Sequence, residues 1–538
     1  MTTLLQRIPA RDPASRHLLK HAQGSALFPG GALLSESAVD KRVKILESWT
    51  GNRTALAQWL ETQNAFAPLH SAQNAHLKAS AQSNALFLLT GQQPVLLGGP
   101  ALWFCKAMTC IVSARISAQR LGHPVIPIFW VAGDDSDLAE CAAVEWLEPK
   151  ADAAGFKMDF PDADASIPMS LRALPESGLN DLFQSLKVFW NEETLSLARK
   201  CYQPGRTLTQ AFLHLAQTLL GSEGILFVDG LSAAKHGAPF LVRLARQGQD
   251  FQKNLWQGTR RLADTLALPP QVTPRGGTLP LFMLEQGKRV RLHASDGDGG
   301  KSKARIFVQG KESRDLSGEL ERLDLLPAAL SRPMMAETIF PVLGHILGPA
   351  ELRYFAQISD VFPAFGLSFP PVQPRQQAML CSKQDWKRLA ELGLRPEDLP
   401  EFSPSKLRSR ISARLWNGDK AAEEFPDQAF LAFTAQMRNY RDRFFPASAD
   451  MEGAGRRFEK GFDGYREAAR RALFARQGAE TYASFRPLLR WLGNGSQDRH
   501  LNLLSLRNIL CAAGFSEWTE LLREETPGIV LAVYGEEI

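Results

Sequence analysis

Apolar runs of strand length alternate with helical patterns in the first part of the chain. One run covers residues 85–89 and stops at Thr90, and another covers residues 125–132. Between them, residues 101–121 repeat apolar side chains at helical spacing and end at Gly122. Short uninterrupted apolar runs are typical of strands buried on both faces of a parallel sheet. The order strand, helix, strand therefore predicts a βαβ unit.

The same alternation continues to about residue 375. A helix expected over 206–220 leads into a third strand in GILFVDG, and a fourth strand is expected within 338–347. Pro349 suits the first turn of the next helix, where its missing N–H is not needed. The segment FPPVQPR is expected to form a short last strand. These elements predict an α/β fold with a parallel sheet at its centre.

Two helical stretches and two insertions complete this core, which we expect to span residues 1–375. Residues 36–80 and 233–268 have helical patterns. An insertion at about 140–200 predicts short strands and turns, and one at about 275–330 predicts a β-hairpin region around GDGGKS. Because GDGGKS lacks the first glycine of a phosphate-binding loop, it favours a hairpin turn over a nucleotide site.

The pattern changes after about residue 376. Five side chains follow a 3, 4, 3, 4 spacing: Phe430, Phe433, Met437, Tyr440 and Phe444. A second row has the same spacing and consists of Met451, Ala454, Phe458, Gly461, Tyr465, Ala468 and Ala472. Heptad spacing on two helices predicts an antiparallel coiled-coil arm over 376–490. The arm either packs on its own core or dimerises, and we expect a homodimer. A small helical segment is expected over 491–538.

Composition narrows the classes of function. The net charge is +5, from 62 basic and 57 acidic side chains, and no long basic block occurs. We therefore do not expect nucleic acid as a partner. The six cysteines are scattered without a C-x-x-C pair, which argues against a zinc site or a disulfide framework. Without a signal core or a window of about 18 apolar residues, a cytoplasmic protein with no membrane segment and no structural metal is expected.

Polar side chains follow the ends of four expected strands. The clusters are Thr90, Gly91, Gln92 and Gln93, with Lys106 in the next helix; Asp134, Asp135, Asp137 and Glu140; Asp229; and Gly348, Pro349, Glu351, Tyr354 and Gln357. In an open α/β sheet, ligands bind beyond the carboxyl ends of the strands. We therefore expect the first, second and fourth clusters to line one cleft.

The acidic cluster is compatible with several roles. Asp134, Asp135 and Asp137 could hold a divalent metal, bind an amine or supply a base. Alternatively, they stand at the N-terminus of a helix, where acidic side chains are stabilised by the helix dipole.

Basic side chains and a glycine-rich loop offer sites for anions. Each of Arg332, Arg353 and Arg375 could form a fork on a carboxylate or phosphate, or make a structural ion pair. The loop GQQPVLLGGP matches neither G-x-G-x-x-G nor the phosphate-loop pattern. Gly98 and Gly99 allow a sharp turn, and the N–H groups of the helix start can bind an anion. An ordinary strand-to-helix connection is the alternative.

Three long segments resemble the motifs of one family. They are TGQQPVLLGGPALWFCKA, HPVIPIFWVAGDDSDLAE, and the stretch from SRPMMAETIF through GPAELRYFAQ to PVQPR. The corresponding motifs are T-G-Q-Q-x-G-L-x-x-G-P, V-P-V-F-W-x-A-G-E-D-H-D, and R-P-x-x-Q-D followed by G-P-[GA]-E-x-x-Y-[FW]-x-Q. In their order, and over most of the chain, these segments resemble the cysteine ligases of bacillithiol biosynthesis, the BshC family.

The resemblance implies a fold and an activity. The implied fold is a Rossmann-like core similar to class I aminoacyl-tRNA synthetases, with connecting insertions and a coiled-coil arm that makes a homodimer. The implied activity is the addition of L-cysteine to glucosaminyl-malate, the last step to bacillithiol. A requirement for ATP or another nucleotide follows from the ligase-like fold. Neither nucleic acid nor a membrane is an implied partner.

The chain departs from the family pattern where chemistry is expected. The family histidine of the acidic motif is Ser136 here, the second glycine of the first motif is Val95, and Gln-Asp after Arg-Pro is Ala336-Glu337. A ligase for a different amine, or a catalytically weakened dimeric homologue that binds a nucleotide or a thiol precursor, are therefore the alternatives.

The resemblance and the clusters together give an expected site. Asp135, Asp137 and Lys106 are assigned to catalysis, with an aspartate accepting the proton of the amine. Donors to developing negative charge are expected at Gly98–Gly99. Substrate or nucleotide binding is assigned to Thr90, Gly91, Gln92, Gln93, Gly99, Asp134, Glu140, Arg332, Glu351, Tyr354 and Gln357, with Arg332 or Arg353 on the malate carboxylates.

Overall fold

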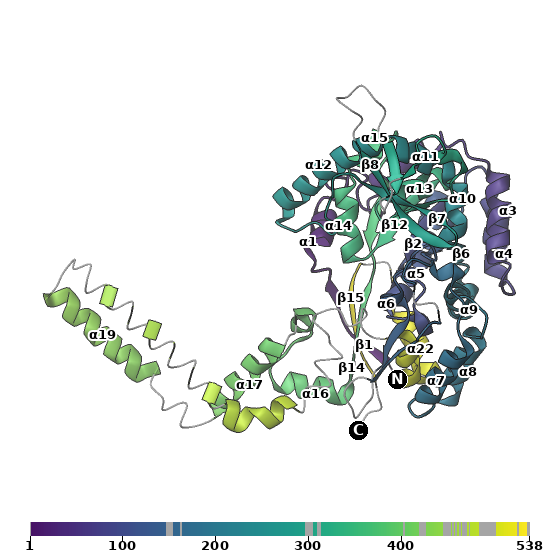
Figure 1. Cartoon of the computed structure of the whole chain (residues 1–538). Coiled ribbons are helices and arrows are strands. Elements are labelled where there is room, and N and C mark those ends of the chain that lie inside the picture. Colours follow the sequence, from purple (N-terminus) through teal and green to yellow (C-terminus); the bar gives the residue numbers. More distant parts are fainter. Residues whose placement is uncertain are drawn as a thin grey trace. The chain divides into compact units, whose positions relative to one another are not determined.

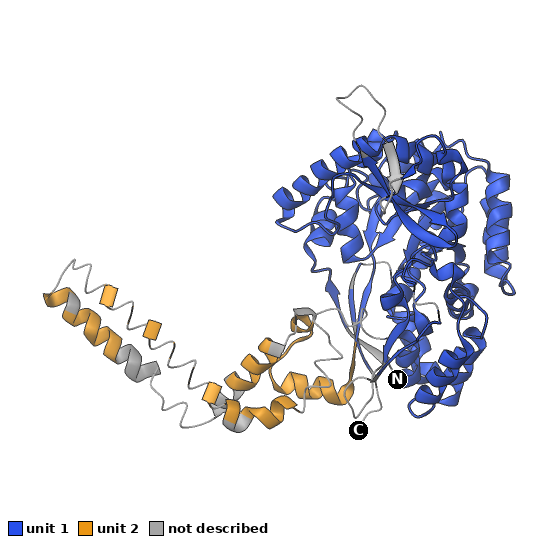
Figure 2. Ribbon diagram, viewed as in Figure 1, with its two compact units in different colours: residues 1–148, 153–379, 498–534 blue, residues 149–152, 380–497, 535–538 orange. Residues whose placement is uncertain are grey.

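The computed structural model has two compact units (Figure 2). It describes residues 2–146, 154–161, 164–295, 305–308, 314–401, 404–418, 427–444, 502–524 and 527–534, with parts of 453–483. Unit 1 comprises residues 1–148, 153–379 and 498–534, and unit 2 comprises residues 149–152, 380–497 and 535–538. Residues 498–534, near the C-terminus, therefore belong to the same unit as the α/β core.

A five-stranded parallel sheet forms the centre of unit 1 (Figure 1). Its strands are β13 (Val372–Pro374), β12 (Val342–Leu347), β2 (Leu86–Gln92), β3 (Val125–Val131) and β6 (Leu226–Asp229), in that order. All four neighbouring pairs are parallel. From β2 the chain adds β3 and β6 on one side and later β12 and β13 on the other. The sheet is Rossmann-like, with its topological switch point between β2 and β12.

Helices cover both faces of this sheet because every central strand is apolar on both sides. On one face, Val39 of α2 (Glu36–Leu46) and Cys110 of α5 (Leu102–Leu121) pack against Leu88 and Leu343. The opposite face is covered by α3 (Arg53–Asn64), α10 (Gly230–His236), α11 (Ala238–Arg246), α12 (Gly248–Leu266), α13 (Arg332–Ile339) and α14 (Pro349–Gln357). The β2–α5–β3 connection confirms the predicted βαβ unit.

The first insertion is partly as expected. A hairpin of β4 (Ala143–Trp146) and β5 (Ala154–Lys157) agrees with the predicted short strands. The prediction of strands and turns was wrong for its second half, which forms α7 (Glu176–Lys187) and α8 (Glu192–Cys201). Leu179, Leu182 and Leu186 have helical spacing and are buried. This short apolar stripe on α7 is the signal that indicates a helix.

The second insertion forms an antiparallel sheet in the order β10-β9-β8-β7-β11. Its strands are β7 (Thr278–Glu285), β8 (Lys288–Ser295), β9 (Arg305–Val308), β10 (Arg314–Asp315) and β11 (Leu325–Pro327). The predicted β-hairpin region is confirmed, while the GDGGKS segment itself lies outside the described residues. A further strand pair, β1 (Thr2–Pro9) with β15 (Gly528–Tyr534), was not predicted.

Further helices complete unit 1. They are α1 (Pro13–Lys20), α4 (Ser71–Ser80), α6 (Leu138–Cys141), α9 (Leu208–Leu220), α15 (Val361–Ala364) and α22 (Leu503–Leu521). The predicted helix over 206–220 and the helix expected near the C-terminus are confirmed. Within the described ranges, none of the helices combines the length and the apolarity that a membrane span requires.

Unit 2 is helical where it is described. After β14 (Gln377–Ser382) come α16 (Lys383–Glu391), α17 (Pro404–Gly418) and α19 (Asp427–Phe444). All five residues of the first heptad row lie on α19, and Phe433, Met437, Tyr440 and Phe444 are 45–55% exposed. In the second row, Met451, Phe458 and Tyr465 lie outside the described residues. The coiled-coil pairing and the homodimer therefore stay predictions.

Candidate active site

A cavity of about 1030 Å³ lies at the carboxyl edge of the parallel sheet. Its lining includes residues from the ends of three strands, namely Gln92 of β2, Ala132 after β3 and Leu347 of β12. This is the position of the topological switch point, where open α/β sheets bind ligands. The first, second and fourth polar clusters therefore meet at one cavity, as the sequence predicted.

Most of the expected site residues line this cavity. They are Thr90, Gly91, Gln92, Gln93, Lys106, Asp135, Glu140, Arg332, Glu351 and Tyr354, and Arg375 lies with them. Gly99, Asp134, Asp137, Gln357 and Arg353 are not part of the lining. The location expected for Gln93, Asp135 and Glu351 is confirmed, whereas their chemical roles stay predictions.

Gly98 and Gly99 do not provide the expected anion site. The Gly98 N–H donates to the Tyr202 hydroxyl at 2.8 Å, and the Gly99 N–H donates to Leu96 O at 2.9 Å. Gly99 has φ +54°, and a Cβ there would lie 2.5 Å from the Val95 Cβ. The glycine is therefore required by the turn and by close packing. The prediction that these N–H groups face a ligand was wrong, because both are used within the protein.

The sequence analysis assigned Gln357 to binding and Asp137 to catalysis, but neither residue is part of the cavity lining. Gln357 is fully buried, and its amide accepts from the N–H groups of Gln271 and Val272 while it donates to Thr259 and Val272. Asp137 caps α6 by accepting from the Glu140 N–H at 3.1 Å. Both side chains hold local structure, and Asp137 has the helix-capping role that was the alternative to catalysis.

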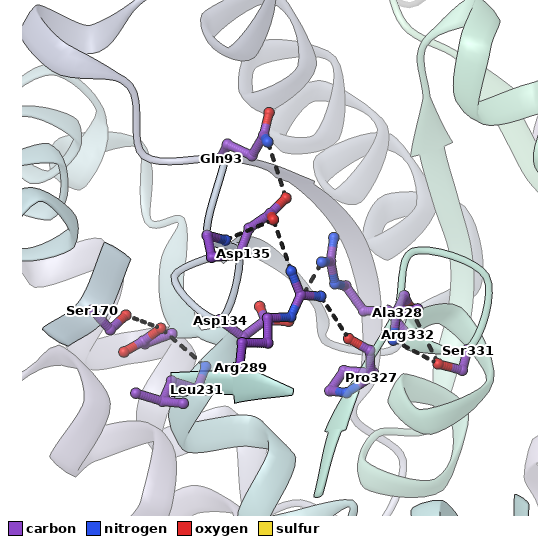
Figure 3. Close-up of polar contacts among 12 residues, drawn as sticks. Gln93, Asp134, Asp135, Ser170, Leu231, Arg289, Pro327, Ala328, Ser331 and Arg332 are labelled. Carbon is purple, nitrogen blue, oxygen red and sulfur yellow. Dashed lines mark hydrogen bonds and ion pairs between the residues drawn. The ribbon is translucent and has the colours of Figure 1, made fainter. Parts of the chain in front are cut away.

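Asp135 is held by three donors at the entrance of the acidic turn (Figure 3). Arg289 Nη1 lies 2.9 Å from Oδ1, Gln93 Nε2 lies 2.9 Å from Oδ2, and the Ser136 N–H lies 2.7 Å from Oδ1. Burial by itself would raise the pKa of Asp135, but Arg289, Arg332 and these hydrogen bonds lower it. Asp135 is therefore a fixed anion and a weak base.

Asp134 lies beneath this turn and faces a second arginine. It is fully buried, and its Oδ2 is 3.5 Å from Arg332 Nη2 (Figure 3). Arg332 begins α13, and 23% of its side chain is exposed. Arg332 thus forms an ion pair with a buried carboxylate and also lines the cavity. A charged group with this arrangement can bind an anionic ligand without losing its structural partner.

A row of basic side chains on β8 was missed by the sequence analysis. Arg289, Arg291 and His293 alternate along the strand, so they share one face, and all three line the cavity. The Phe282 ring of β7 lies 3.7 Å from the guanidinium carbon of Arg289 and 4.1 Å from that of Arg291. These cation–π contacts orient both arginines. The alternation in KRVRLHAS is the signal that could have indicated this basic face.

Lys106 joins two strand ends rather than projecting freely into the cavity. Its Nζ lies 2.9 Å from Gly91 O, 2.8 Å from Gln92 Oε1 and 2.7 Å from Glu351 Oε2. Its side chain is 4% exposed. Glu351 also accepts from the Gly348 N–H at 2.7 Å, which caps α14. Since an ammonium has three donors and all three are used, Lys106 positions the loop after β2 against the start of α14.

Burial is the main cause of a raised pKa at two further carboxylates. Burial, followed by the negative charge of Asp137, raises the pKa of Glu140, which lines the cavity. Burial raises the pKa of Asp229 to about 6. Asp229 is outside the cavity lining and caps α10, accepting from the Leu231 N–H at 3.1 Å and from the Ser170 hydroxyl at 2.8 Å. Of these two, Glu140 is the one placed to meet a ligand.

No group of three or more His, Cys, Asp or Glu side chains within the described residues is arranged to hold a metal ion. The charged side chains that line the cavity include six basic and three acidic ones, namely Lys106, Arg275, Arg289, Arg291, Arg332, Arg375, Asp135, Glu140 and Glu351. This arrangement can bind carboxylates or phosphates through the arginines, and an amine through the acidic side chains.

Comparison with known proteins identifies relatives of this chain. Residues 14–376 match the family model described as bacillithiol biosynthesis BshC, N-terminal Rossmann-like domain. A protein of Geobacillus thermodenitrificans named "Putative cysteine ligase BshC" is 27% identical over 79% of this chain and 76% of its own length. A protein of the same name from Shouchella clausii is 28% identical over 88% of this chain and 88% of its own length. Another of the same name, from Koribacter versatilis, is 30% identical over 59% of this chain and 58% of its own length. The chain belongs to the BshC family.

Proposed function

We propose that this chain forms the amide bond between the carboxyl group of L-cysteine and the amino group of glucosaminyl-malate. The relatives are named cysteine ligases, which supports an enzyme that forms carbon–nitrogen bonds. The observation that supports the proposal best is the meeting of three distant motifs at one cavity. Gln93, Asp135 and Glu351 come from these motifs, and arginines with acidic partners complete the lining.

The basic side chains fit the carboxylates of the malate part of the acceptor. Arg291 is exposed, and it stands beside His293 and Arg275 on the cavity wall. Arg289 already forms an ion pair with Asp135, and Arg332 forms one with Asp134. We therefore assign the first contact with substrate carboxylates to Arg291, and a second contact to Arg332, which also lines the cavity. A planar guanidinium can bind a carboxylate through two parallel hydrogen bonds.

The acidic side chains fit the amino groups of the two substrates. Asp135 keeps its negative charge because its pKa is lowered, so it suits binding of an ammonium group better than proton abstraction. Glu140 has a raised pKa and lies in the same lining. This changes the assignment made from the sequence, in which Asp135 and Asp137 were expected to accept the proton.

Activation of the cysteine carboxyl requires a third substrate, and we propose a nucleoside triphosphate. When bound, it would supply the phosphoryl or nucleotidyl group that turns the carboxylate into a reactive mixed anhydride. The lining contains arginines suited to phosphate oxygens, including Arg275 and Arg291. Gly98 and Gly99 do not contribute, because their N–H groups are already bonded.

Amide synthesis by the purified chain tests this function. L-cysteine, glucosaminyl-malate and ATP are incubated with the protein, and the product mass is followed by mass spectrometry. Arg291→Gln should raise KM for glucosaminyl-malate about tenfold, which corresponds to about 1.4 kcal/mol. Arg314→Gln is the matched control, since Arg314 lies on β10 of the same sheet and outside the cavity lining. Failure of the wild-type protein to form the product under any nucleotide would contradict the proposal.

We also propose that the protein acts as a homodimer in the cytoplasm. The support for a dimer is the row Phe433, Met437, Tyr440 and Phe444, whose side chains are about half exposed on α19. Large apolar side chains at heptad spacing gain most when a second helix covers them.

A further inference from the structure

His345 is a second cavity histidine, placed deep on the central sheet and unused by the site described so far. It lies on β12 between Gly344 and Ile346, lines the cavity and is 6% exposed. In the sheet it stands opposite Leu89 of β2. The Phe355 ring of α14 packs beside it at a centroid distance of 5.2 Å. The ring is therefore held between the sheet and α14 with an edge toward the cavity.

A buried carboxylate lies behind this histidine. Glu337 of α13 is 7% exposed, and its Oε1 is 3.4 Å from His345 Nε2. Among the described residues, neither Glu337 Oε1 nor His345 Nε2 has a hydrogen-bond partner, so their 3.4 Å approach is an electrostatic contact between two buried groups. The carboxylate thus approaches the imidazole from a buried residue that is outside the cavity lining.

Arg42 fixes the carboxylate in this orientation. Arg42 of α2 is 3% exposed and pairs through Nη2 with the other oxygen of Glu337. Arg42 Nε donates to Val342 O at 2.8 Å and Nη1 donates to Ser368 O at 3.2 Å. The guanidinium therefore cannot turn toward the cavity. Its role is to hold Glu337, and Glu337 in turn holds the ring of His345.

This chain of contacts selects one tautomer of the neutral imidazole. An ionised Glu337 can only accept, and its Oε1 lies 3.4 Å from Nε2, so the neutral ring is favoured with its hydrogen on Nε2. Nδ1 is then the nitrogen with a free lone pair. Since Nε2 faces the buried carboxylate, Nδ1 is the nitrogen left for a group in the cavity. A carboxylate that orients a histidine in this way also stabilises the imidazolium formed on proton uptake.

We propose that His345 accepts the proton released by the attacking amine and that Glu337 is its positioning residue. This inference rests on the proposed function. The amine nitrogen forms a bond to the carbonyl carbon of the mixed anhydride, and the bond from that carbon to the phosphate oxygen breaks with its electron pair. The nitrogen loses one proton to Nδ1 of His345, and the imidazolium later returns it to water. The products are the amide and the phosphate-containing leaving group.

The assignment agrees with the state of the other candidates. Asp135 is a weak base because its pKa is lowered, and Asp137 is used as a helix cap. Ser136 stands where the family motif has a histidine. His345 comes from a different strand, β12, and lies next to the carboxylate of Glu337. An imidazole can accept a proton near neutral pH, whereas the hydroxyl group of Ser136 cannot. The cavity therefore holds a histidine candidate for the proton acceptor in addition to Glu140 of the acidic cluster.

Substitution at both positions tests this pair. His345→Gln should lower kcat for amide synthesis about 100-fold while KM for both substrates changes less than about threefold. Glu337→Gln should lower kcat by a smaller factor and shift the ¹⁵N resonances of His345 away from the Nε2–H tautomer. The tautomer is measured by NMR on the free protein, so that readout does not depend on activity. His123→Gln, outside the cavity lining, is the matched control.

Rescue by a small base separates proton transfer from packing. His345→Ala should regain turnover with added imidazole and not with pyrazole, a ring of the same size that is a far weaker base. Equal rescue by both rings, or full activity of a folded His345→Gln protein, would overturn the assignment of His345 alone. A wild-type protein that makes no amide would instead overturn the proposed function, and with it the step assigned here.

Discussion

Arg289 Nη1 lies 2.9 Å from Asp135 Oδ1, and the two residues are 154 positions apart in the chain. Arg289 belongs to β8 of the second insertion, whereas Asp135 belongs to the turn after β3 of the core. The Arg289 side chain is 8% exposed and that of Asp135 is 26% exposed. The pair attaches the insertion to the acidic turn and makes the insertion part of the cavity wall.

Asp135→Asn should now cost stability as well as activity. Loss of the charge weakens the bond to a mostly buried guanidinium, for which we expect a loss of about 1–3 kcal/mol in the free energy of unfolding. Activity should fall through weaker substrate binding. Because the pKa of Asp135 is lowered in the folded protein, its contribution is present above the ordinary value of 3.8 and is lost as the pH falls below it. Urea unfolding at pH 7 and at pH 3.5 measures the difference.

Asp137→Asn is the matched control for that experiment. Asp137 is exposed and caps α6, and an asparagine caps a helix about as well as an aspartate. We expect a change of less than about 0.5 kcal/mol and nearly full activity. If Asp137→Asn abolishes turnover in a folded protein, Asp137 belongs to the mechanism after all.

Lys106→Met should separate the loop after β2 from the start of α14. The substitution removes three hydrogen bonds of a buried ammonium and leaves Glu351 without its ion-pair partner. We expect a loss of about 2–4 kcal/mol, since breaking a buried pair costs more than an exposed one. Lys288→Met is the control, because Lys288 is 51% exposed and pairs with Asp164 at the surface. Equal losses for the two variants would show that Lys106 is not a structural link.

Asp229→Asn should stabilise the protein at neutral pH. The pKa of Asp229 is raised by burial from 3.8 to about 6, so the folded state binds its proton more tightly than the unfolded state. Its contribution to stability is therefore full below pH 3.8 and is lost as the pH rises through 6. An amide keeps the acceptor for Leu231 and has no charge to bury. The gain over wild type should reach about 2 kcal/mol at pH 7.5 and shrink toward pH 4.

Thermal or urea unfolding of both proteins between pH 4 and pH 8 measures this effect. The difference between the two curves isolates Asp229, since all other titrating groups are shared. A difference that is constant with pH would mean that Asp229 titrates normally in the folded protein.

Met437→Glu should convert the expected dimer into a monomer. Met437 is 46% exposed near the middle of the apolar row on α19, and a charge there opposes burial against a second helix. Light scattering at micromolar concentration gives the mass of each species. Arg438→Glu is the control, because it introduces a negative charge at the next residue of α19, which is not part of the heptad row. This variant should keep the molecular mass of the wild-type dimer. A wild-type monomer would contradict the proposed assembly.

Sequence patterns were sufficient for the parallel core. The apolar runs that became β2, β3 and β6 are uninterrupted because both faces of these strands are covered by helices. Gly122 ends α5 with φ +65°, where a glycine is favoured. The convergence of Gln93, Asp135 and Glu351 also followed from the sequence, because carboxyl ends of parallel strands share one edge.

Only the tertiary structure decided which hydrogen-bond and ion-pair partners each polar group has. A local pattern shows that Asp135, Lys106 and Gly99 follow strands, and it does not show which partners they meet. Arg289, which binds Asp135, belongs to another sheet. Lys106 donates to Gly91, Gln92 and Glu351, and the Gly99 N–H donates to the carbonyl oxygen of Leu96.

His345 is the clearest case of this division. Its strand was expected from its apolar neighbours, yet a histidine on a buried strand has no periodic signal that distinguishes a core residue from a proton acceptor. Its partners Glu337 and Arg42 come from α13 and α2, and the Arg42–Glu337 pair spans 295 positions of the chain. The sequence by itself determined the α/β core and the edge at which its site lies, because periodicity and strand order are local. Charge pairing depends on distances between elements, which exist only once the chain has folded.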